Sequence, residues 1–321
     1  MNNFHIYEAI GKGKHSVVYK GRKKKSILYY AIKSVEKSQK ARVLQEVRTL
    51  HSLDHKNILK FYAWYETSNH LWLILEYCVG SDLLALMRQD MRLPEPSVHD
   101  FARDIITAMQ FLHSNGLIYC DLKPSNLLLD ENGRVKLCDF GLSRRLSDIA
   151  KASVAQLPQG KRGTPCYMAP ELFQDGGVHS TASDLWALGC VLYEMVAGHP
   201  PFVSSSLQQL VNMVLDQDPK PLTNVGAEFA DLVSRLLVKN PAERLHWEGL
   251  LRHPFWKFNL PPRPMPKEPA LDAFIDANGL RPAPSAPPGI RSSMRESQVD
   301  VMRISQIVRS NLQREDGDES E

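Results

Sequence analysis

The chain has 321 residues, of which 43% are hydrophobic and 23% are charged. This length allows one large two-lobed domain with a tail, or two domains, and the apolar share is sufficient for a core. The formal net charge of +3 is too small to indicate a nucleic-acid partner, and no apolar run approaches the roughly 20 residues of a membrane span.

Cysteine usage and the N-terminus indicate where the protein is expected to work. The five cysteines are scattered, and no two of them are spaced as a CxxC pair. An odd, dispersed set favours a reducing compartment without a disulfide framework. Residues 1–16 contain no apolar core of a signal peptide. We therefore expect a cytoplasmic protein with no membrane segment and no nucleic-acid partner.

Short strands and one helix are expected in residues 4–79. The expected strands cover residues 16–22, 28–35, 57–66 and 70–78. Residues 40–53 carry apolar side chains at helical spacing with charges between them. We interpret the basic run at residues 22–25, which lies between the first two strands, as a solvated turn rather than a phosphate-binding patch.

Helices dominate the part of the chain that follows. Residues 96–114 are amphipathic, and Asn115–Gly116 is a typical signal for the C-terminus of a helix. Residues 182–197 are almost wholly apolar, which predicts a central buried helix. The sequence thus predicts an α+β fold in which a β-rich lobe of residues 4–79 precedes a helical lobe of residues 80–256.

Residues 257–321 differ in composition from the rest of the chain. Residues 260–289 are rich in proline and predict a semi-extended linker. An apolar stripe at helical spacing follows, and it consists of Val301, Ile304, Val308 and Leu312. Residues 315–321 are acidic. We interpret this part as a linker and tail with a short helix, through which a protein partner could bind.

The first candidate for chemistry is a glycine-containing bend between two strands, "IGKGKHSVVYKG" at residues 10–21. Gly11, Gly13 and Val18 fit the pattern G-x-G-x-x-G-x-V, and Ser16 stands at the third glycine position. Such a bend lets backbone N–H groups approach phosphate oxygens. Glycine-containing hairpins are common, so the bend alone does not identify a phosphate site.

A lysine and a glutamate form the second candidate. Lys33 ends the strand "YAIKS", and Glu46 lies on the helix that follows. A lysine turned inward needs a partner because an unpaired buried charge is costly. The pair would hold a positive charge against phosphate oxygens, whereas Lys33 alone would read as a surface lysine.

Several polar residues crowd into "CDLKPSNLLLDENGRVKLCDFG", residues 120–141, at the ends of two short strands. Asp121 could accept a proton from an attacking hydroxyl, and Lys123 could neutralise charge on a transferring phosphoryl group. Asn126 and Asp139 offer the hard oxygen ligands that Mg²⁺ prefers. Each of these residues alone would also fit an ordinary turn.

The order of these elements carries the interpretation. The bend, Lys33, Glu46, the D-x-K-x-x-N and D-F-G motifs, and finally "APE" at residues 169–171 follow one another at suitable spacing. Residues 4–256 therefore resemble the eukaryotic protein kinases. The resemblance implies a bilobal kinase fold that transfers the γ-phosphate of ATP to a protein substrate, with ATP and Mg²⁺ bound between the lobes.

The resemblance assigns roles to individual positions. The expected catalytic residues are Asp121, Lys123, Lys33 and Glu46, and the expected metal ligands are Asn126 and Asp139. The expected ATP-binding residues are Ile10, Gly11, Gly13, Val18, Ala31, Lys33, Glu76, Cys78, Asp82 and Leu128. "DLKPSN" and Thr164 in "GTPCYMAPE" resemble the serine/threonine type, so the acceptor is expected to be a serine or threonine hydroxyl.

Further structural roles are implied by the same resemblance. A stacked apolar column between the lobes would consist of Leu50, Phe61, Tyr119 and Phe140. Asp184 would anchor the backbone of the catalytic loop, and Arg244 would pair with Glu171. "GKGKHSVVYKGR", "WYETSNHLWLILEYCVG" and "YCDLKPSN" are similar to the Unc-51-like and Fused-like branch, whose members often carry helical repeats after the kinase.

The chain departs from most relatives before the catalytic aspartate. Tyr119 and Cys120 stand where relatives have His-Arg. In the family, that arginine grips a phosphate on the activation loop through charge-assisted bonds. Cys120 cannot do so, and we therefore expect activity without phosphorylation of Ser147 or Ser153. The uncharged Ser125 predicts no strong preference for arginine upstream of the acceptor.

Two other classes of function stay open at this point. A pseudokinase scaffold would bind ATP or partners without efficient transfer, and Ser16, Tyr119 and Cys120 motivate that alternative. A docking protein would act through the proline-rich tail. The enzyme hypothesis is favoured because every residue expected to touch phosphate or metal is present.

Overall fold

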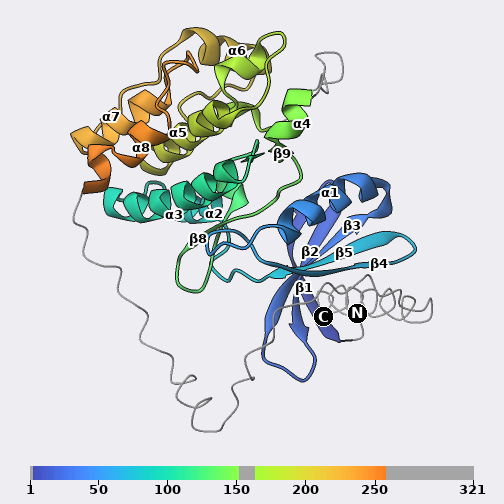
Figure 1. Cartoon of the computed structure of the whole chain (residues 1–321). Coiled ribbons are helices and arrows are strands. Elements are labelled where there is room, and N and C mark those ends of the chain that lie inside the picture. The colour runs from blue at the N-terminus through green and yellow to red at the C-terminus, as the bar shows by residue number, and fades with distance from the viewer. Residues whose placement is uncertain (1–2, 152–162, 258–321) are drawn as a thin grey trace.

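A computed structural model describes residues 3–151 and 163–257 of the chain. The described residues do not include Ser153 or residues 258–321, so the predictions made for them are not tested. Within them, the chain folds into two lobes, and the small lobe is built around a strongly twisted sheet (Figure 1). None of the helices in this part of the chain combines the length and the apolar character that a membrane crossing requires.

The small lobe contains an antiparallel five-stranded sheet in the order β1-β2-β3-β5-β4. Its strands are β1 (Phe4–Gly13), β2 (Ser16–Lys23), β3 (Tyr29–Glu36), β4 (Phe61–Glu66) and β5 (His70–Glu76). The short η1 (Lys37–Gln39) leads into α1 (Lys40–His51), and α1 buries Val43, Val47 and Leu50. These elements confirm the expected strands and helix, although β4 begins at Phe61 rather than at residue 57; of the basic run, Arg22 and Lys23 belong to β2, and Lys24 and Lys25 form the exposed turn.

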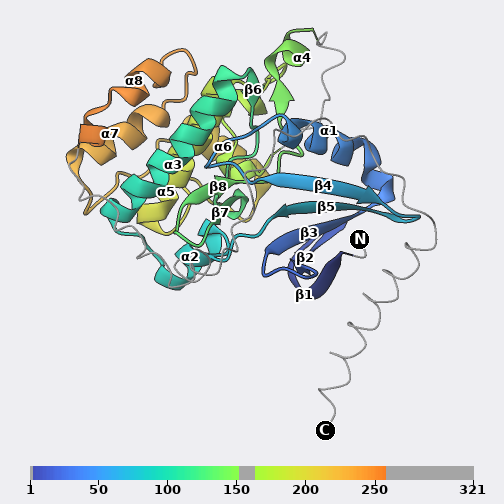
Figure 2. The same cartoon turned by 60° about the horizontal axis from the view of Figure 1, so that its bottom comes forward.

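The large lobe is helical, and α5 packs against α3 and α7 within it (Figures 1 and 2). Its helices are α2 (Leu83–Asp90), α3 (Glu95–Ser114), α4 (Leu146–Lys151), α5 (Thr181–Ala197), α6 (Leu207–Asp216), α7 (Ala227–Leu236) and α8 (Trp247–Leu251). The 3-10 turns are η2 (Pro124–Asn126), η3 (Pro165–Tyr167), η4 (Pro170–Phe173) and η5 (Pro254–Lys257). The helix α3 ends at Asn115–Gly116 as expected, where Gly116 adopts a φ of 68°.

The helix α5 forms the centre of the large lobe. Ser180 caps its N-terminus by accepting a hydrogen bond from Ser183 N, and Gly198 ends it in the left-handed conformation. Every residue from Ala182 to Met195 is buried, so this apolar segment packs on all sides rather than along one stripe. The expected central buried helix is therefore confirmed.

Two pairs of short strands belong to the large lobe. The strands β7 (Leu127–Leu129) and β8 (Val135–Leu137) form a hairpin whose turn ends at Gly133, with a φ of 66°. The strand β6 (Leu117–Ile118) pairs with β9 (Arg144–Arg145). These pairings place the segments around Asp121 and Asp139 side by side at the boundary between the lobes.

Candidate active site

The glycine-containing bend forms the end of the β1–β2 hairpin. Gly11 pairs with Val18, and Gly13 pairs with Ser16, so the bend is only two residues long. Val18 in turn pairs with Lys33 across β2 and β3. This register places the bend and Lys33 in one small region of the sheet, although the two segments are separated in sequence.

Lys33 and Glu46 form a buried ion pair. Lys33 Nζ lies 2.8 Å from Glu46 Oε1 and 3.2 Å from Oε2, and Glu46 is buried. Burial by itself lowers the pKa of Lys33, but the carboxylates of Glu46 and Asp139 outweigh it and raise that pKa above its ordinary value. Lys33 therefore stays charged. The charge of Asp139 contributes to this effect.

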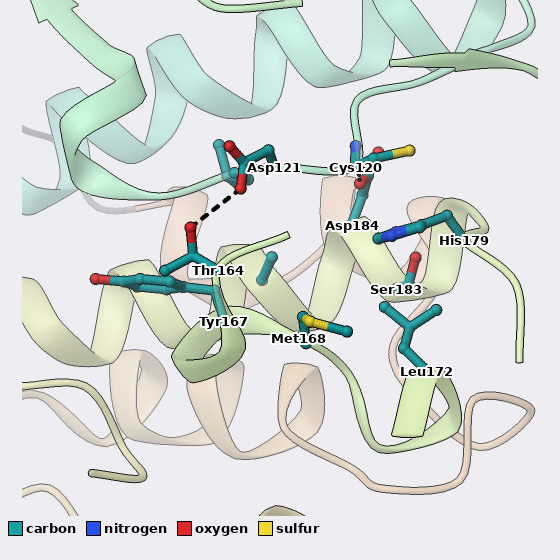
Figure 3. A pocket seen from close by; sticks show the side chains of 11 residues that line it. Cys120, Asp121, Thr164, Tyr167, Met168, Leu172, His179, Ser183 and Asp184 are labelled. Carbon is teal, nitrogen blue, oxygen red and sulfur yellow. Dashed lines mark hydrogen bonds between the residues drawn. The ribbon is translucent and has the colours of Figure 1, made fainter. Parts of the chain in front are cut away.

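A hydrogen-bond network surrounds Asp121. Lys123 Nζ donates to Asp121 Oδ2 at 2.8 Å and to Thr164 Oγ1 at 2.8 Å. Thr164 Oγ1 donates to Asp121 Oδ1 at 3.2 Å, and Figure 3 shows these two side chains facing each other. Asn126 Nδ2 donates to the backbone oxygen of Asp121 at 2.9 Å and to Oδ2 at 3.1 Å. The network fixes the carboxylate in one orientation.

Asp184 holds the backbone of the catalytic loop from the first turn of α5. Its carboxylate accepts hydrogen bonds from Tyr119 N at 2.8 Å and Cys120 N at 2.9 Å. These bonds support a φ of 71° at Cys120, a left-handed conformation that costs energy for a residue with a side chain. His113 Nε2 donates to the same carboxylate at 2.8 Å, because His113 Nδ1 accepts from Trp247 Nε1 at 2.9 Å. The anchoring role expected for Asp184 is confirmed.

One contact of the expected apolar column, that of Tyr119 with Phe140, is confirmed. The rings of Tyr119 and Phe140 meet edge to face with centroids 5.2 Å apart. Leu50, Tyr119 and Phe140 belong to one buried cluster, and Phe61 packs against it. The hydroxyl of Tyr119 also donates to the backbone oxygen of Cys138. Tyrosine therefore fills the packing position and ties down the residue that precedes Asp139.

Asp139 adopts a backbone conformation that few non-glycine residues adopt. Its φ is 57°, and its Oδ1 accepts a hydrogen bond from Gly141 N at 3.3 Å. Asp139 is close enough to Lys33 to raise the pKa of that lysine. The negative charge of Asp139 therefore acts on the Lys33 ammonium.

The segment between the lobes positions the other residues expected to meet the nucleotide. Glu76 places its carboxylate 2.7 Å from Lys136 Nζ and accepts from Lys60 N at 3.0 Å, and its own backbone N–H donates to Lys60 O at 2.9 Å. Asp82 caps α2 by accepting from Ala85 N at 2.9 Å. The sequence did not indicate this cap, and it occupies one of the two Asp82 oxygens.

Apolar residues expected around the adenine lie near this segment. Ala31 pairs with Leu75 in the sheet, and Leu128 forms a bridge with Asp82. Ile10 lies near the end of β1 and is 44% exposed. Their contact with a nucleotide stays a prediction.

All five cysteines are free, in agreement with the expected absence of a disulfide framework. Burial raises the pKa of the Cys78 thiol to about 12 and also raises the pKa of Cys138. Both thiols are therefore protonated at neutral pH and are poor nucleophiles. Cys138 has Lys33, Asp139 and Cys78 among its electrostatic neighbours, which places it beside the expected nucleotide site.

The activation segment, which runs from Asp139 to Glu171, is anchored at both ends. At its start, β9 pairs with β6, and Leu146 N donates to Gly116 O at 2.8 Å. At its end, Arg244 donates to both Glu171 oxygens, at 2.8 and 2.9 Å. Arg244 is only 1% exposed, so this bidentate pair is part of the core. The pairing expected from the sequence is confirmed.

A small cavity of about 10 Å³ lies next to the catalytic loop. Asp121 and Thr164 line one part of it, and Cys120, Asp184 and His179 line another (Figure 3). A cavity of this size has room for about one water molecule. It cannot hold a substrate side chain, so an acceptor hydroxyl has to reach Asp121 from outside this cavity.

Sequence reasoning missed two interactions behind the site. Trp247 fixes the ring of His113, and Tyr167 Oη donates to Glu194 Oε2 at 2.7 Å beneath η3. Each pair joins segments far apart in the chain, so no local pattern indicates the contact. The only available signal was the presence of polar side chains within otherwise apolar helices.

Comparisons with known proteins agree with this geometry. The family model described as "Protein kinase domain" matches residues 4–256. The serine/threonine-protein kinase RUNKEL of Arabidopsis thaliana is 60% identical over 87% of this chain and 20% of its own length. The kinase ULK4 of Mus musculus is 40% identical over 80% of this chain and 22% of its own length.

A third relative is serine/threonine-protein kinase 36 of Mus musculus, which is 36% identical over 79% of this chain and 19% of its own length. The chain thus spans about a fifth of the length of the curated relatives that it matches. The family match covers both lobes and all the motifs described above. The chain therefore belongs to the protein kinase family, as a serine/threonine kinase domain of the Unc-51-like and Fused-like branch.

Proposed function

We propose that this protein transfers the γ-phosphate of ATP to serine or threonine hydroxyls of protein substrates in the cytosol, and that it does so without phosphate on its activation segment. The main support is the simultaneous presence of three features in one conformation. These features are the Lys33–Glu46 ion pair, the packing of Tyr119 on Phe140, and the network around Asp121.

Asp121 is assigned as the group that orients the acceptor hydroxyl and accepts its proton. Thr164 and Lys123 hold its carboxylate, and Lys123 Nζ also donates to Thr164 Oγ1 at 2.8 Å. Lys123 supplies a positive charge next to the position where the phosphoryl group is transferred. Phosphoryl transfer depends mainly on positioning and on charge stabilisation, which this arrangement provides.

Lys33 is assigned to the phosphates of ATP, with Glu46 fixing its direction. Asn126 and Asp139 fit a magnesium ion, because both offer oxygen donors and Asn126 has committed its amide nitrogen to Asp121. Bound there, Mg²⁺ would neutralise phosphate charge. Ile10, Gly11, Gly13, Val18, Ala31, Glu76, Cys78, Asp82 and Leu128 are assigned to the nucleotide.

We infer independence from activation-segment phosphorylation because Cys120 stands where most relatives have an arginine. The Cys120 thiol is buried and donates to Ile118 O at 3.6 Å, so this position offers no cation to a phosphate. The β6–β9 pairing and the Arg244–Glu171 pair hold the two ends of the segment instead. Neither anchor contains a serine, threonine or tyrosine that could carry a phosphate.

The test is transfer from radiolabelled ATP to a generic protein substrate by the full chain. Asp121→Asn and Asp139→Ala should each lower the rate by about 10²–10⁴-fold, the usual effect of losing a general base or a comparable catalytic group. Asp90→Asn, at an exposed carboxylate at the end of α2, is the control and should leave the rate unchanged.

The same assay separates the enzyme from the scaffold alternative. If wild type and both variants are equally inert while ATP still raises the melting temperature, the protein binds nucleotide without transferring phosphate. That result would replace the proposed function by the pseudokinase scaffold.

A further inference from the structure

The turn between β2 and β3 exposes large apolar side chains. Ile27, Leu28 and Tyr29 are 65%, 56% and 45% exposed, and Tyr7 of β1 is 39% exposed. The rings of Tyr7 and Tyr29 lie 6.3 Å apart. We call Tyr7, Ile27, Leu28 and Tyr29 the turn patch. Neighbouring exposed apolar residues of this size mark interaction sites on soluble proteins.

Hydrogen bonds hold this turn in one shape. Arg22 donates from Nη1 to Ser26 O at 2.8 Å and from Nε to Tyr7 Oη at 3.0 Å. Lys23 N donates to Leu28 O at 3.0 Å, and Leu28 N donates to Ser26 Oγ at 3.0 Å. The exposed side chains are therefore presented by an ordered turn, which lowers the entropy lost when a partner binds.

The same turn carries a run of positive charge. Arg22, Lys23, Lys24 and Lys25 follow one another, and the three lysines are exposed. Within residues 3–151 and 163–257, no acidic side chain forms an ion pair with these lysines. A ligand suited to this surface combines an apolar face with a cluster of carboxylates.

Such a segment exists in this chain after the described residues. Val301, Ile304, Val308 and Leu312 recur at helical spacing, and five acidic residues follow within residues 315–321. The charges at the β2–β3 turn and at residues 315–321 are opposite in sign. The 43 intervening residues, 258–300, span up to about 140 Å when extended, which exceeds the width of a domain of this size.

We propose that residues 301–321 dock on the β2–β3 turn of the same molecule. The stripe of Val301, Ile304, Val308 and Leu312 covers the turn patch, and the carboxylates of residues 315–321 meet Lys23, Lys24 and Lys25. In the segment, the apolar stripe lies next to the acidic residues. At the turn, the turn patch lies next to the three lysines, so the apolar contact and the charge contact can form together. This docking does not depend on the catalytic activity proposed above.

Zero-length carbodiimide coupling of the dilute full chain tests the proposal, because it joins a lysine amine to a carboxylate only when the two are in contact. Mass spectrometry of the monomer fraction should find Lys23, Lys24 or Lys25 joined to carboxylates of residues 315–321. Ile27→Ser with Leu28→Ser leaves every coupling group in place and should reduce these products about tenfold, as expected when about 1.4 kcal/mol of apolar contact is lost.

A reciprocal variant and a matched control complete the design. Ile304→Ser with Val308→Ser should cause the same loss of products. Val203→Ser with Leu207→Ser removes two other exposed apolar side chains, 54% and 59% exposed on the large lobe, and should change nothing. Melting temperatures of all variants show whether the fold is retained.

Three outcomes would overturn the proposal. The first is the absence of these coupled products in the monomer. The second is coupling found only between two molecules, which would identify a second copy as the occupant. The third is a product yield that the turn-patch substitutions leave unchanged, which would indicate contact by charge alone.

Discussion

The side-chain hydroxyl of Tyr119 donates a hydrogen bond to the backbone oxygen of Cys138, the residue directly before Asp139. Burial raises the pKa of Tyr119 well above its ordinary value, so the hydroxyl keeps its proton at neutral pH. The tyrosine ring packs edge to face on Phe140 at the same time. One side chain thus connects the catalytic loop to the segment that carries the expected metal ligand.

Tyr119→Phe keeps the ring and removes only the hydroxyl. We expect it to lower the free energy of unfolding by about 1 kcal/mol, the usual contribution of one hydrogen bond. Tyr119→Ala also removes the buried ring and should cost about 3–5 kcal/mol. Urea unfolding of the two variants measures the difference, and equal losses would show that the ring packing contributes little.

Glu46→Gln should lower the transfer rate about tenfold or more, because a charge-assisted bond of about 1.5–3 kcal/mol no longer directs Lys33. The pKa of Lys33 is raised in the folded protein, so the contribution of the ion pair is complete below the unfolded value of about 10.5 and is lost only above it. The ratio of wild-type to variant rates should therefore be constant from pH 6 to pH 9. A ratio that falls across this interval would contradict the assignment.

Glu194→Gln should stabilise the protein at neutral pH. Burial raises the pKa of Glu194 in the folded protein above its value in the unfolded chain. The folded protein therefore loses stability as the pH rises from the pKa of the unfolded state through that of the folded state. The glutamine cannot ionise and still offers an oxygen to Tyr167. We expect a melting temperature a few degrees above wild type at pH 7.5 and equal to it near pH 4. Glu248→Gln, at a glutamate whose side chain is 76% exposed, is the control.

Arg244→Met should lower the free energy of unfolding by about 3–5 kcal/mol, because it removes a fully buried arginine and leaves the half-buried Glu171 without its partner. Arg252→Met is the matched control, since its ion pair with Glu248 has side chains 79% and 76% exposed and should contribute at most about 1 kcal/mol. Denaturant unfolding compares the two variants. Similar losses would mean that burial of the Arg244 pair has little effect.

Alanine or glutamate at Ser147 and Ser153 should leave the transfer rate within a few-fold of wild type, because Cys120 offers no charge to a phosphate. Ser147 is exposed on α4, and Ser153 lies outside the described residues. Thr164→Ala should reduce the rate strongly by releasing Asp121 and Lys123, whereas Thr164→Ser keeps the hydroxyl and should retain most activity. A large loss at Ser147 or Ser153 would contradict independence from phosphorylation.

The sequence predicted the two-lobed fold and the chemistry-bearing residues because both depend on local patterns. Lys33 lies within a recognisable strand, which continues to Glu36 rather than ending at the lysine as the sequence predicted; Asp139 follows β8, and Glu46 lies on an amphipathic helix. The buried helix α5 followed from a run that is almost wholly apolar, with only a few polar residues such as Asp184 and Glu194. The ordered spacing of the motifs then indicated the family, which the comparison over residues 4–256 confirmed.

Other features depend on tertiary contacts and were not predictable in the same way. Asp82 caps a helix that no strong pattern indicated, and the Tyr167–Glu194 bond joins residues 27 apart in the chain. The exposed fraction of Ile27 and Leu28 depends on how the β2–β3 turn is held by Arg22. Apolar residues in a sequence are normally expected to be buried, so their exposure became evident only in the folded chain.

The attachment of the catalytic loop to α5 through Asp184 has a mechanical consequence. Asp121, the proposed proton acceptor, lies on a loop bound to the helical core, whereas Lys33, which is proposed to contact the nucleotide, lies in the sheet. Widening of the gap for nucleotide exchange can then proceed as a hinge motion that leaves the acceptor geometry intact. Changes in the sheet should accordingly alter the nucleotide Michaelis constant more than the alignment of the hydroxyl.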